Sequence, residues 1–260
     1  MRRHIPLTST VLMAAVLLAS GAAIAEPSKG DAQQLEEART SAEHQLKQSF
    51  ANLSFEEFAL SPITGPIYQA SAGGRILYYA PDSEHILFAT VYDRNGVNVT
   101  ALSQGDRVRR QLSAIDPSQA LAIGPAEAPV VIEFTDPDCP YCRALDKFWK
   151  AKAAEGKPVR RLVYFVSGIH PKAAAKAEHI MCSDDKTAAF HALYEGTAPG
   201  NLRSCAVGKA KVEADAALVR KLGIGGTPSL IVDGRLISGF QQAELEEFLT
   251  KAMPAKPPGS

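Results

Sequence analysis

The stretch Phe134-Thr135-Asp136-Pro137-Asp138-Cys139-Pro140-Tyr141-Cys142 decides the fold of the second half of this chain. The apolar run that enters it, residues 129–134, is typical of a buried strand. Beyond it, Leu145, Phe148 and Trp149 have the spacing of one helix face, and Gly156 and Pro158 would end that helix. The Cys-x-x-Cys motif therefore lies where a strand is followed at once by a helix.

This position points to thiol chemistry. A sulfur at a helix N-terminus meets unpaired backbone N–H groups and the helix dipole, both of which stabilise a thiolate. We therefore expect Cys139 to be the nucleophile and Cys142, one turn later, to be the resolving cysteine. The alternatives are a static disulfide and half of a zinc site. No His-x-x-His and no second tight cysteine pair accompany the motif, so we predict neither a metal nor a cofactor.

The dipeptide between the cysteines, Pro140-Tyr141, tunes the redox poise of the site. It lacks a histidine that could add a positive charge beside the sulfur, so we expect a milder oxidant than a dedicated disulfide donor. Downstream, Thr227-Pro228 precedes a predicted hairpin strand. A cis Pro228 beside the cysteines would expose the Thr227 backbone to an extended substrate segment, whereas the alternative is an ordinary trans loop proline.

Glu133 lies inside the apolar strand, six residues before Cys139. If it points inward, a buried carboxylate with a raised pKa could accept the proton of Cys142 during resolution. If it points outward, it is a solvated strand residue. Cys182 and Cys205 enclose a helical segment, and we expect them to form a structural disulfide rather than a second redox pair.

The first residues predict export. A basic start at Arg2 and Arg3, a short apolar run and the pattern Ala23-Ile24-Ala25 are typical of a signal peptide cleaved near Ala25. The apolar run is too short to span a bilayer, and no other segment could do so. All four cysteines follow the signal and would meet an oxidising compartment. With 28 basic and 28 acidic residues, charge favours neither nucleic acid nor an anionic membrane as partner.

Two structural units are expected. A polar helix over 31–50 and β-rich runs at 75–79, 86–92 and 97–100 predict a small antiparallel sheet. A charged connector follows from Gln104 to Pro117. The second unit, from about Gly124, orders strand, helix, strand, helices, hairpin and helix, which is an α/β layer arrangement. The predicted division is as follows: signal peptide 1–25, N-terminal domain 26–103, linker helix 104–123, catalytic domain 124–254 and flexible tail 255–260.

Several motifs together resemble the DsbC/DsbG group of bacterial periplasmic disulfide isomerases. They are the Cys-Pro-Tyr-Cys stretch, His170-Pro171-Lys172-Ala173, the pair Cys182 and Cys205, Gly225-Gly226-Thr227-Pro228, and, before them, Gly65-Pro66-Ile67-Tyr68, Gly73-Gly74-Arg75-Ile76-Leu77-Tyr78 and Tyr92-Asp93 leading to Asn98-Val99-Thr100. The resemblance runs over most of the chain after the signal.

The resemblance implies an α+β, cystatin-like dimerisation domain joined by a helical linker to an α/β thioredoxin-fold domain with a helical insertion. It further implies a periplasmic homodimer whose cleft holds misfolded exported proteins, and a membrane-bound, DsbD-like reductase that keeps Cys139 reduced. Thr227 matches the residue before the cis-proline. Glu133 departs from the family, where this position is apolar. Pro140-Tyr141 fits the DsbG-like branch better than the Gly-Tyr of DsbC.

The expected activity is therefore that of a protein disulfide isomerase or thiol–disulfide oxidoreductase. Cys139 would attack a wrong disulfide, and either a substrate thiol or Cys142 would release it. Two alternatives stay open. One is a DsbG-like reductase of sulfenylated cysteines, and the other is a dimeric holdase that binds unfolded chains without needing its cysteines.

Overall fold

The computed structural model describes residues 29–253, so the predicted signal with its cleavage near Ala25 and the predicted tail 255–260 lie outside the described residues. The chain divides into two compact units, up to Ala38 and from Arg39 onward. The described part of the first unit is the opening of helix α1 (Lys29–Ser49), where Gln33 donates a hydrogen bond to Glu37 one turn later.

A four-stranded antiparallel sheet follows α1 in the chain. Its strands pair in chain order: β1 (Phe55–Leu60), β2 (Tyr68–Ala72), β3 (Arg75–Ala80) and β4 (His85–Leu87). Alternate residues of β2 and β3 face inward and pack with Ala42 and Leu46 of α1, as the two-residue period of a strand requires. The core of this sheet consists of Tyr68, Ala70, Leu77 and Tyr79 together with those two helix residues.

Several details differ from the sequence prediction. The strand expected over 86–92 ends at Leu87, and Tyr92 forms only an isolated bridge with Asn98. The run at 97–100 is not a strand, because Asn98 caps helix α2 (Val99–Arg110) by accepting a hydrogen bond from the Ala101 N–H at 2.9 Å. The connector helix therefore starts before Gln104. Strands β1 and β2 were not among the predicted runs.

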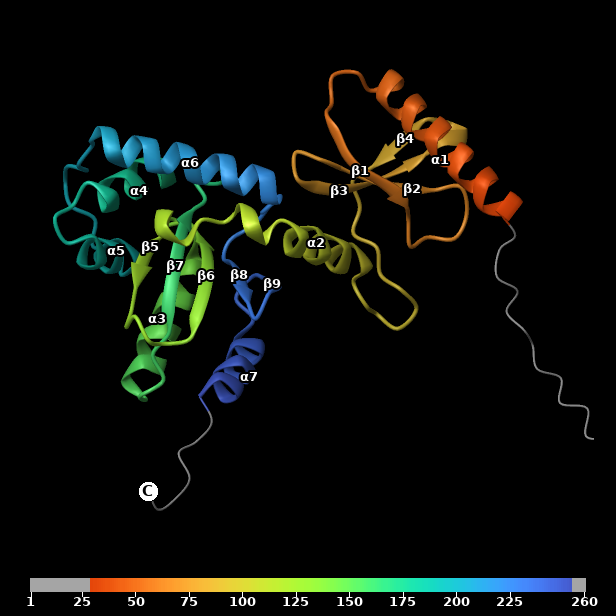
Figure 1. The fold of residues 1–260 in the computed structure, drawn as a ribbon. Helices are drawn as coiled ribbons and strands as arrows, with labels where there is room; N and C mark the ends of the chain where they lie inside the picture. Colours follow the sequence, from red (N-terminus) through yellow and green to blue (C-terminus); the bar gives the residue numbers. More distant parts are fainter. Residues whose placement is uncertain (1–28, 254–260) are drawn as a thin grey trace, which may run out of the picture. The chain divides into compact units, whose positions relative to one another are not determined.

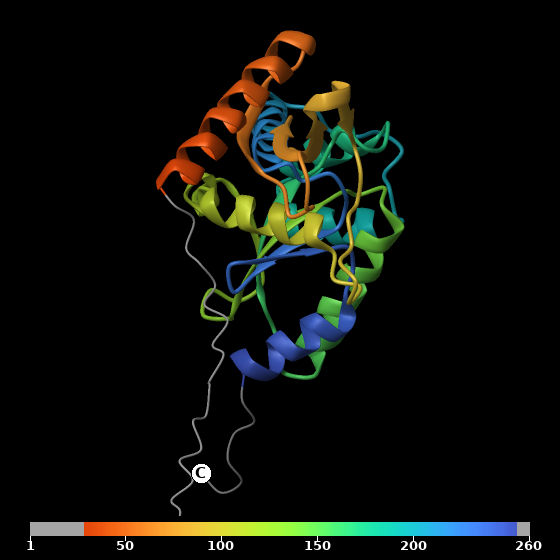
Figure 2. The same ribbon diagram turned by 90° about the vertical axis from the view of Figure 1, so that its right-hand side faces the viewer.

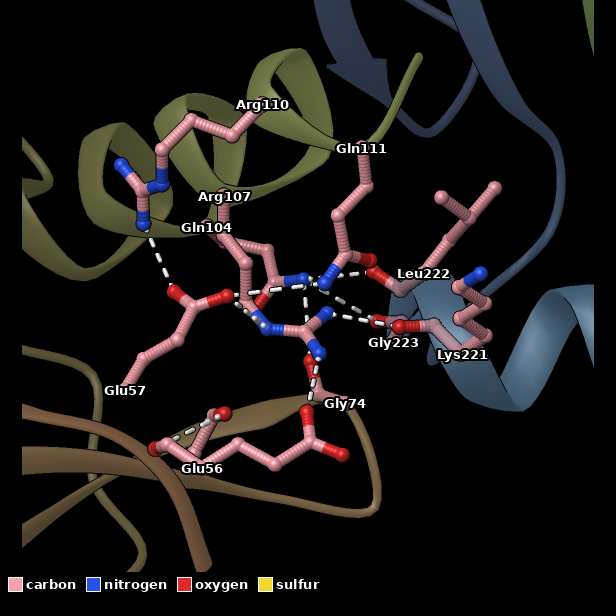
Figure 3. A network of polar contacts seen from close by, with 11 residues as sticks. Glu56, Glu57, Gly74, Gln104, Arg107, Arg110, Gln111, Lys221, Leu222 and Gly223 are labelled. Carbon is pink, nitrogen blue, oxygen red and sulfur yellow. Dashed lines mark hydrogen bonds and ion pairs between the residues drawn. The ribbon is translucent and has the colours of Figure 1, made fainter. Parts of the chain in front are cut away.

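Helix α2 is tied by polar contacts to β1 and to helix α6 (Ala206–Leu222) (Figure 3). The buried Arg107 donates to Glu56 Oε2 and to the Lys221 carbonyl, each at 2.8 Å. Arg110 pairs with Glu57 at 2.6 Å, and Gln104 donates to the carbonyls of residues 74 and 222. Side chains on successive turns of α2 therefore make polar contacts with the β-sheet and with α6.

Two glycines meet at this junction. Gly74, between β2 and β3, and Gly223, the C-cap of α6, both have positive φ, and their backbones touch. A Cβ on either glycine would overlap the backbone of the other. Glycine is therefore required here both for its conformation and for the close approach of two chain segments.

The C-terminal domain is built on a five-stranded sheet in the order β5-β7-β6-β8-β9, in which only β6 and β7 are parallel. The strands are β5 (Leu121–Ile123), β6 (Val130–Thr135), β7 (Arg160–Phe165), β8 (Ser229–Val232) and β9 (Arg235–Ser238). In β6, Val131, Glu133 and Thr135 share one face, while Ile132 and Phe134 share the other. This alternation decides which residues can reach the cysteines.

Helices cover both faces of this sheet. Helices α3 (Pro140–Ala154) and α7 (Gln242–Ala252) pack on the face of Val131, and α2 with the end of α6 packs on the face of Phe134. Accordingly, α2 and α7 lie on opposite sides of the β8–β9 hairpin in both views (Figure 1, Figure 2). The helical stretch predicted over 171–222 is three helices, α4 (Ala173–Met181), α5 (Lys186–Tyr194) and α6. Within 29–253, no helix is long and apolar enough to cross a membrane.

Candidate active site

The junction between β6 and α3 places both cysteines of the Cys-x-x-Cys motif. Cys139 is the N-cap residue of α3, Pro140 occupies the first helical position, and the Cys139 N–H donates to the Asp136 carbonyl at 3.1 Å. Proline fits there because its missing N–H would have no partner in the first turn. Cys139 is 4% exposed and Cys142 is fully buried, whereas Tyr141 between them is 67% exposed.

The segment before β8 lies against the first cysteine. The peptide bond between Thr227 and Pro228 is cis, and the Cys139 thiol donates to the Thr227 carbonyl across 3.3 Å. The structure thus brings together Cys139 and the Thr227–Pro228 segment, both singled out from the sequence, although 88 positions separate Cys139 from Thr227. The backbone of Thr227 is next to the Cys139 sulfur.

The sulfur of Cys142 lies inside the domain among hydrogen-bond donors. The Asp136 N–H points at it from 3.5 Å. Burial raises the pKa of the Cys142 thiol, and the polar groups of Thr135, Asp136 and Thr227 partly oppose that rise. The Cys142 sulfur is therefore shielded from solvent, yet it is not surrounded by apolar atoms alone.

Behind Cys142 lies a pair of buried hydroxyl groups that sequence reasoning did not find. Tyr194, the last residue of α5, has its hydroxyl 2.9 Å from Thr135 Oγ1, and both side chains are almost completely buried. The Tyr194 ring stacks on Phe190 with centroids 3.9 Å apart. Nothing in the sequence links Tyr194 to Thr135, because they are 59 positions apart and the tyrosine occupies an ordinary core position of a helix.

Glu133 points inward, as its proposed role requires, but its carboxylate already has a partner. Arg161 of β7 donates to both of its oxygens, each at 2.8 Å, and also to Asp146 of α3 at 2.6 Å. Burial alone would lower the pKa of Arg161, yet the two carboxylates raise it, so the guanidinium stays charged. These bonds occupy one lone pair on each Glu133 oxygen. The only sequence signal for this cluster was a charge in each of two apolar strands.

The loop that carries Cys139 is acidic, and each of its carboxylates has a basic partner near α4. His170 Nδ1 lies 2.8 Å from Oδ2 of the fully buried Asp136. Lys176 pairs with Asp138, which also lies 3.7 Å from Arg143. The other Asp136 oxygen accepts the Asp138 N–H at 2.8 Å. Asp136 therefore links the loop, both cysteines and the segment around His170 through its backbone and side chain together.

Cys182 and Cys205 form a disulfide that joins the end of α4 to the N-cap of α6. It lies within the helical insertion, away from the exchange motif in the sequence. Among residues 29–253, no group of three or more His, Cys, Asp or Glu side chains could hold a metal ion.

Two family models match the chain. One is described as the disulfide bond isomerase protein N-terminal domain and matches residues 24–101, and the other is described as a thioredoxin-like domain and matches residues 117–253. The predicted fold class, an α+β unit joined by a helical linker to an α/β thioredoxin-fold domain with a helical insertion, is confirmed.

Curated relatives carry the same resemblance. The thiol:disulfide interchange protein DsbC of Salmonella typhimurium is 32% identical over 213 residues, which are 78% of this chain and 85% of that protein. The thiol:disulfide interchange protein DsbG of Pseudomonas aeruginosa is 27% identical and covers 63% of this chain and 68% of its own. A solved disulfide interchange protein from Neisseria gonorrhoeae is 28% identical, with a TM-score of 0.44 over 53% of this chain and 98% of its own.

Proposed function

Because the chain belongs to the DsbC family of thiol:disulfide interchange proteins, we propose that Cys139 and Cys142 are the residues that carry out its exchange reaction. The observation that supports this most directly is the place of Cys139 at the N-cap of α3, 3.3 Å from the Thr227 carbonyl. The free N–H groups of the first turn interact favourably with a negative sulfur. The enzyme is a thiol–disulfide oxidoreductase.

The first step is attack on a substrate disulfide. The Cys139 thiolate bonds to one sulfur of the substrate, the substrate S–S bond breaks, and its other sulfur leaves as a thiolate. If that thiolate or another substrate thiol then attacks the mixed disulfide, Cys139 is released, the substrate is isomerised and no electrons are gained or lost. If Cys142 attacks instead, the substrate is reduced and the enzyme ends with a Cys139–Cys142 disulfide.

The surroundings of Cys139 support recognition of an extended peptide. Thr227 offers its backbone beside the sulfur, and pairing of a substrate segment with that backbone would add a strand next to Pro228. Pro140 begins the helix, and the exposed Tyr141 side chain lies beside the approach to Cys139. These four residues would shape the substrate site.

We further propose that the enzyme works in the periplasm on exported proteins with incorrect disulfides, and that a membrane-bound, DsbD-like thiol reductase keeps Cys139 reduced. An isomerase must begin each cycle with a free thiolate, so an electron donor is needed whenever Cys142 resolves a mixed disulfide. Alkylation trapping in cells tests this: Cys139 should be found reduced, and a mostly oxidised pair would instead indicate a disulfide donor.

The N-terminal sheet would supply a homodimer interface. Its edge strands are β1 and β4, and Leu60 and Leu87 on them are 59% and 43% exposed. An unpaired strand edge with exposed apolar side chains is suited to pairing with a second copy. Light scattering should give twice the mass of one chain. We also propose that the chain is divided into domains 26–103 and 124–254 with a linker at 104–123. The domain at 26–103 would form the dimer.

Glu133 remains a proposed proton acceptor for Cys142, and the structure indicates what limits it. Arg161 donates to both carboxylate oxygens, so a proton taken up by Glu133 would weaken these charge-assisted hydrogen bonds. A Glu133→Gln variant keeps the shape of the side chain and removes its negative charge. If resolution by Cys142 keeps its wild-type rate in that variant, Glu133 is not the acceptor.

Scrambled ribonuclease tests the activity itself. Wild type should restore native disulfides in a redox buffer, Cys139→Ala should not, and Cys142→Ala should retain part of the isomerisation because a substrate thiol can complete that route. The control is Cys182→Ala/Cys205→Ala, which removes two cysteine sulfurs outside the Cys-x-x-Cys motif. Equal activity of wild type and Cys139→Ala would disprove the assignment.

Two other functions remain candidates. The match to DsbG and the Pro140-Tyr141 dipeptide favour a reductase of sulfenylated cysteines. The exposed apolar residues Phe88, Tyr92 and Leu102, which are 58–68% exposed, favour a holdase that binds unfolded chains. Suppression of aggregation that survives Cys139→Ala and Cys142→Ala would identify holding as the main role. If the protein reduces a sulfenylated protein faster than it repairs scrambled ribonuclease, the function as a reductase of sulfenylated cysteines is favoured.

A further inference from the structure

The buried hydroxyl groups of Thr135 and Tyr194 lie near Cys142. We propose that they stabilise the negative charge that the Cys142 sulfur carries after it loses its proton and before it attacks the mixed disulfide. Thr135 would contact the reacting sulfur, and Tyr194 would act through Thr135 as a positioning residue. This inference rests on the proposed exchange by Cys139 and Cys142, and it assigns a role in that reaction to the helical insertion, which supplies Tyr194.

The geometry places the hydroxyls in series. Thr135 is the last residue of β6 and shares the inner face of that strand with Glu133, so its side chain points toward the start of α3 and Cys142. Tyr194 reaches the same point from α5, with its hydroxyl 2.9 Å from Thr135 Oγ1. Among residues 29–253, the Tyr194 hydroxyl has no other hydrogen-bond partner.

A charge on Cys142 needs such support because the site excludes water. Cys142, Thr135 and Asp136 are all fully buried, and an unsolvated thiolate is costly unless donors surround it. The Asp136 N–H is one donor, at 3.5 Å. Burial raises the pKa of the thiol, and the Thr135 hydroxyl is the first of the groups that oppose the rise.

The role of Tyr194 follows from what a hydroxyl can do. Each hydroxyl has one proton to donate, so when Thr135 donates to the sulfur it must accept in its bond with Tyr194. Tyr194 is then the donor in that bond. Burial raises the pKa of Tyr194 well above its usual range, so its proton stays in place throughout the working pH range. Hydrogen bonds in such a chain strengthen one another, and bonds to a charged sulfur are stronger than neutral ones.

Other titratable groups also face this site, and their charges contribute to the electrostatic potential at Cys142. They are Cys139 on the same helix, the Asp136–His170 pair of the loop, Glu133 and Arg161 on β6 and β7, and Tyr194 itself on α5. Glu133 and Arg161 oppose each other in charge and are joined by two hydrogen bonds. Removal of the Thr135 or Tyr194 hydroxyl changes no charge among these groups.

The reaction balances without another reagent. Cys142 loses its proton and attacks the Cys139 sulfur, the bond between Cys139 and the substrate sulfur breaks, and the Cys139–Cys142 bond forms. The substrate sulfur leaves as a thiolate and takes up a proton from solvent in place of the one that Cys142 gave up. Enzyme thiols are oxidised by two electrons and the substrate disulfide is reduced by two.

The test separates the two steps of this reaction in one experiment. Reduced full-length protein is mixed with excess oxidised glutathione, samples are quenched with acid at set times, and the Cys139–glutathione adduct is counted by mass spectrometry between pH 6 and 9. Formation of the adduct reports Cys139 and its decay reports Cys142. We expect Thr135→Val to leave formation within twofold of wild type and to slow decay about tenfold, the effect of losing one hydrogen bond to a charged group.

Matched variants separate a role for the hydroxyls from a loss of packing. Tyr194→Phe removes one oxygen and should slow decay by a smaller factor, with the pH profile of decay shifted to higher pH in both variants. Thr135→Ser keeps the hydroxyl and should restore the wild-type profile. Tyr164→Phe is the control, because it removes another buried tyrosine hydroxyl, one that donates to the Asp116 carbonyl at 2.7 Å on the other face of the sheet.

Each outcome decides the matter. Decay at the wild-type rate and pH profile in folded Tyr194→Phe overturns the proposal, even if Thr135→Val fails to fold. Equal slowing of decay in Tyr164→Phe also overturns it, because the effect would then be a general one of lost hydroxyls. If wild type forms no adduct at Cys139, the proposed function itself fails, and this result is distinct from a normal adduct whose decay ignores both hydroxyls.

Discussion

The Nδ1 atom of His170 lies 2.8 Å from Oδ2 of Asp136, a carboxylate that is fully buried in the loop carrying Cys139. His170 itself is about one-third exposed, with a side-chain exposure of 36%. A partly exposed side chain thus contacts a buried carboxyl group three positions before Cys139.

Replacement of this histidine should disturb the active-site loop. We expect His170→Ala to lower the free energy of unfolding by about 1–3 kcal/mol, because a buried carboxylate loses a hydrogen-bond donor, and to slow alkylation of Cys139. Chemical denaturation and iodoacetamide kinetics measure the two effects. His170→Asn, whose amide can donate in place of Nδ1, should recover part of both. His44→Ala, at an exposed site on α1, is the control, and an equal effect there would contradict the prediction.

The buried ion cluster predicts a dependence of stability on acid. Burial alone would raise the pKa of Asp146, but the hydrogen bond with His191 and the charge of Arg161 outweigh it and hold that pKa at about 2. A carboxyl with a depressed folded-state pKa stabilises the fold above its unfolded pKa, near 4, and this stabilisation disappears as pH falls toward 2. We expect Asp146 to contribute about 2 kcal/mol to the acid dependence of unfolding.

The comparison that isolates Asp146 is the difference between wild type and Asp146→Asn. Other carboxyls also titrate in this range and cancel in that difference. Urea unfolding followed at several pH values between 2 and 6 should show curves that converge toward low pH. Parallel curves would mean that the cluster does not hold the carboxylate in its charged form.

Two neighbouring glycines give a sharp test of the junction between the β2–β3 turn and α6. Gly73→Ala should lower the free energy of unfolding by about 1 kcal/mol, since its φ is +55° but open space surrounds the site. Gly74→Ala should cost clearly more, because its Cβ would overlap the backbone of Arg220 and Gly223 in addition to the strain of its φ of +80°. Thermal unfolding of both variants measures the difference. Equal losses would show that the contact does not persist in solution.

The disulfide in the helical insertion should matter for stability and not for chemistry. We expect Cys182→Ala/Cys205→Ala to unfold with a free energy lower by about 3 kcal/mol, the usual contribution of a crosslink that closes a loop of this size. Exchange by Cys139 should stay near the wild-type rate at a temperature where the variant is folded. Loss of exchange in a folded variant would show that this pair takes part in the reaction.

The parts of the site that could be read from the sequence are those that a short stretch encodes. The β6–α3 junction, with a proline after Cys139, carries its own strand, turn and helix signals over a few residues. The hairpin of β8 and β9 is equally local, because Asp233-Gly234 specifies its turn. Glu133 was predicted to face inward or outward depending on strand register, and the register places it inward.

What could not be read depended on partners far along the chain. Arg161 meets Glu133 across 28 positions, and Tyr194 meets Thr135 across 59. Strand β1 was missed because Glu56 and Glu57 interrupt its apolar pattern, Glu57 has a positive φ, and the pairing with β2 shifts register there. The run at 97–100 was taken for a strand because valines alternate in it, but the Asn98 cap decides for a helix.

The contact between Tyr194 and Thr135 also limits how far this enzyme can be simplified. A trimmed protein made by joining the end of β7 to the segment that begins at Gly225 would keep Cys139, Cys142 and the Thr227–Pro228 segment, but it would omit α5. Such a protein would still take up a substrate at its first cysteine and would then release it slowly. If the four-residue motif alone were grafted onto a smaller scaffold, the product would therefore form mixed disulfides with substrates but would resolve them slowly.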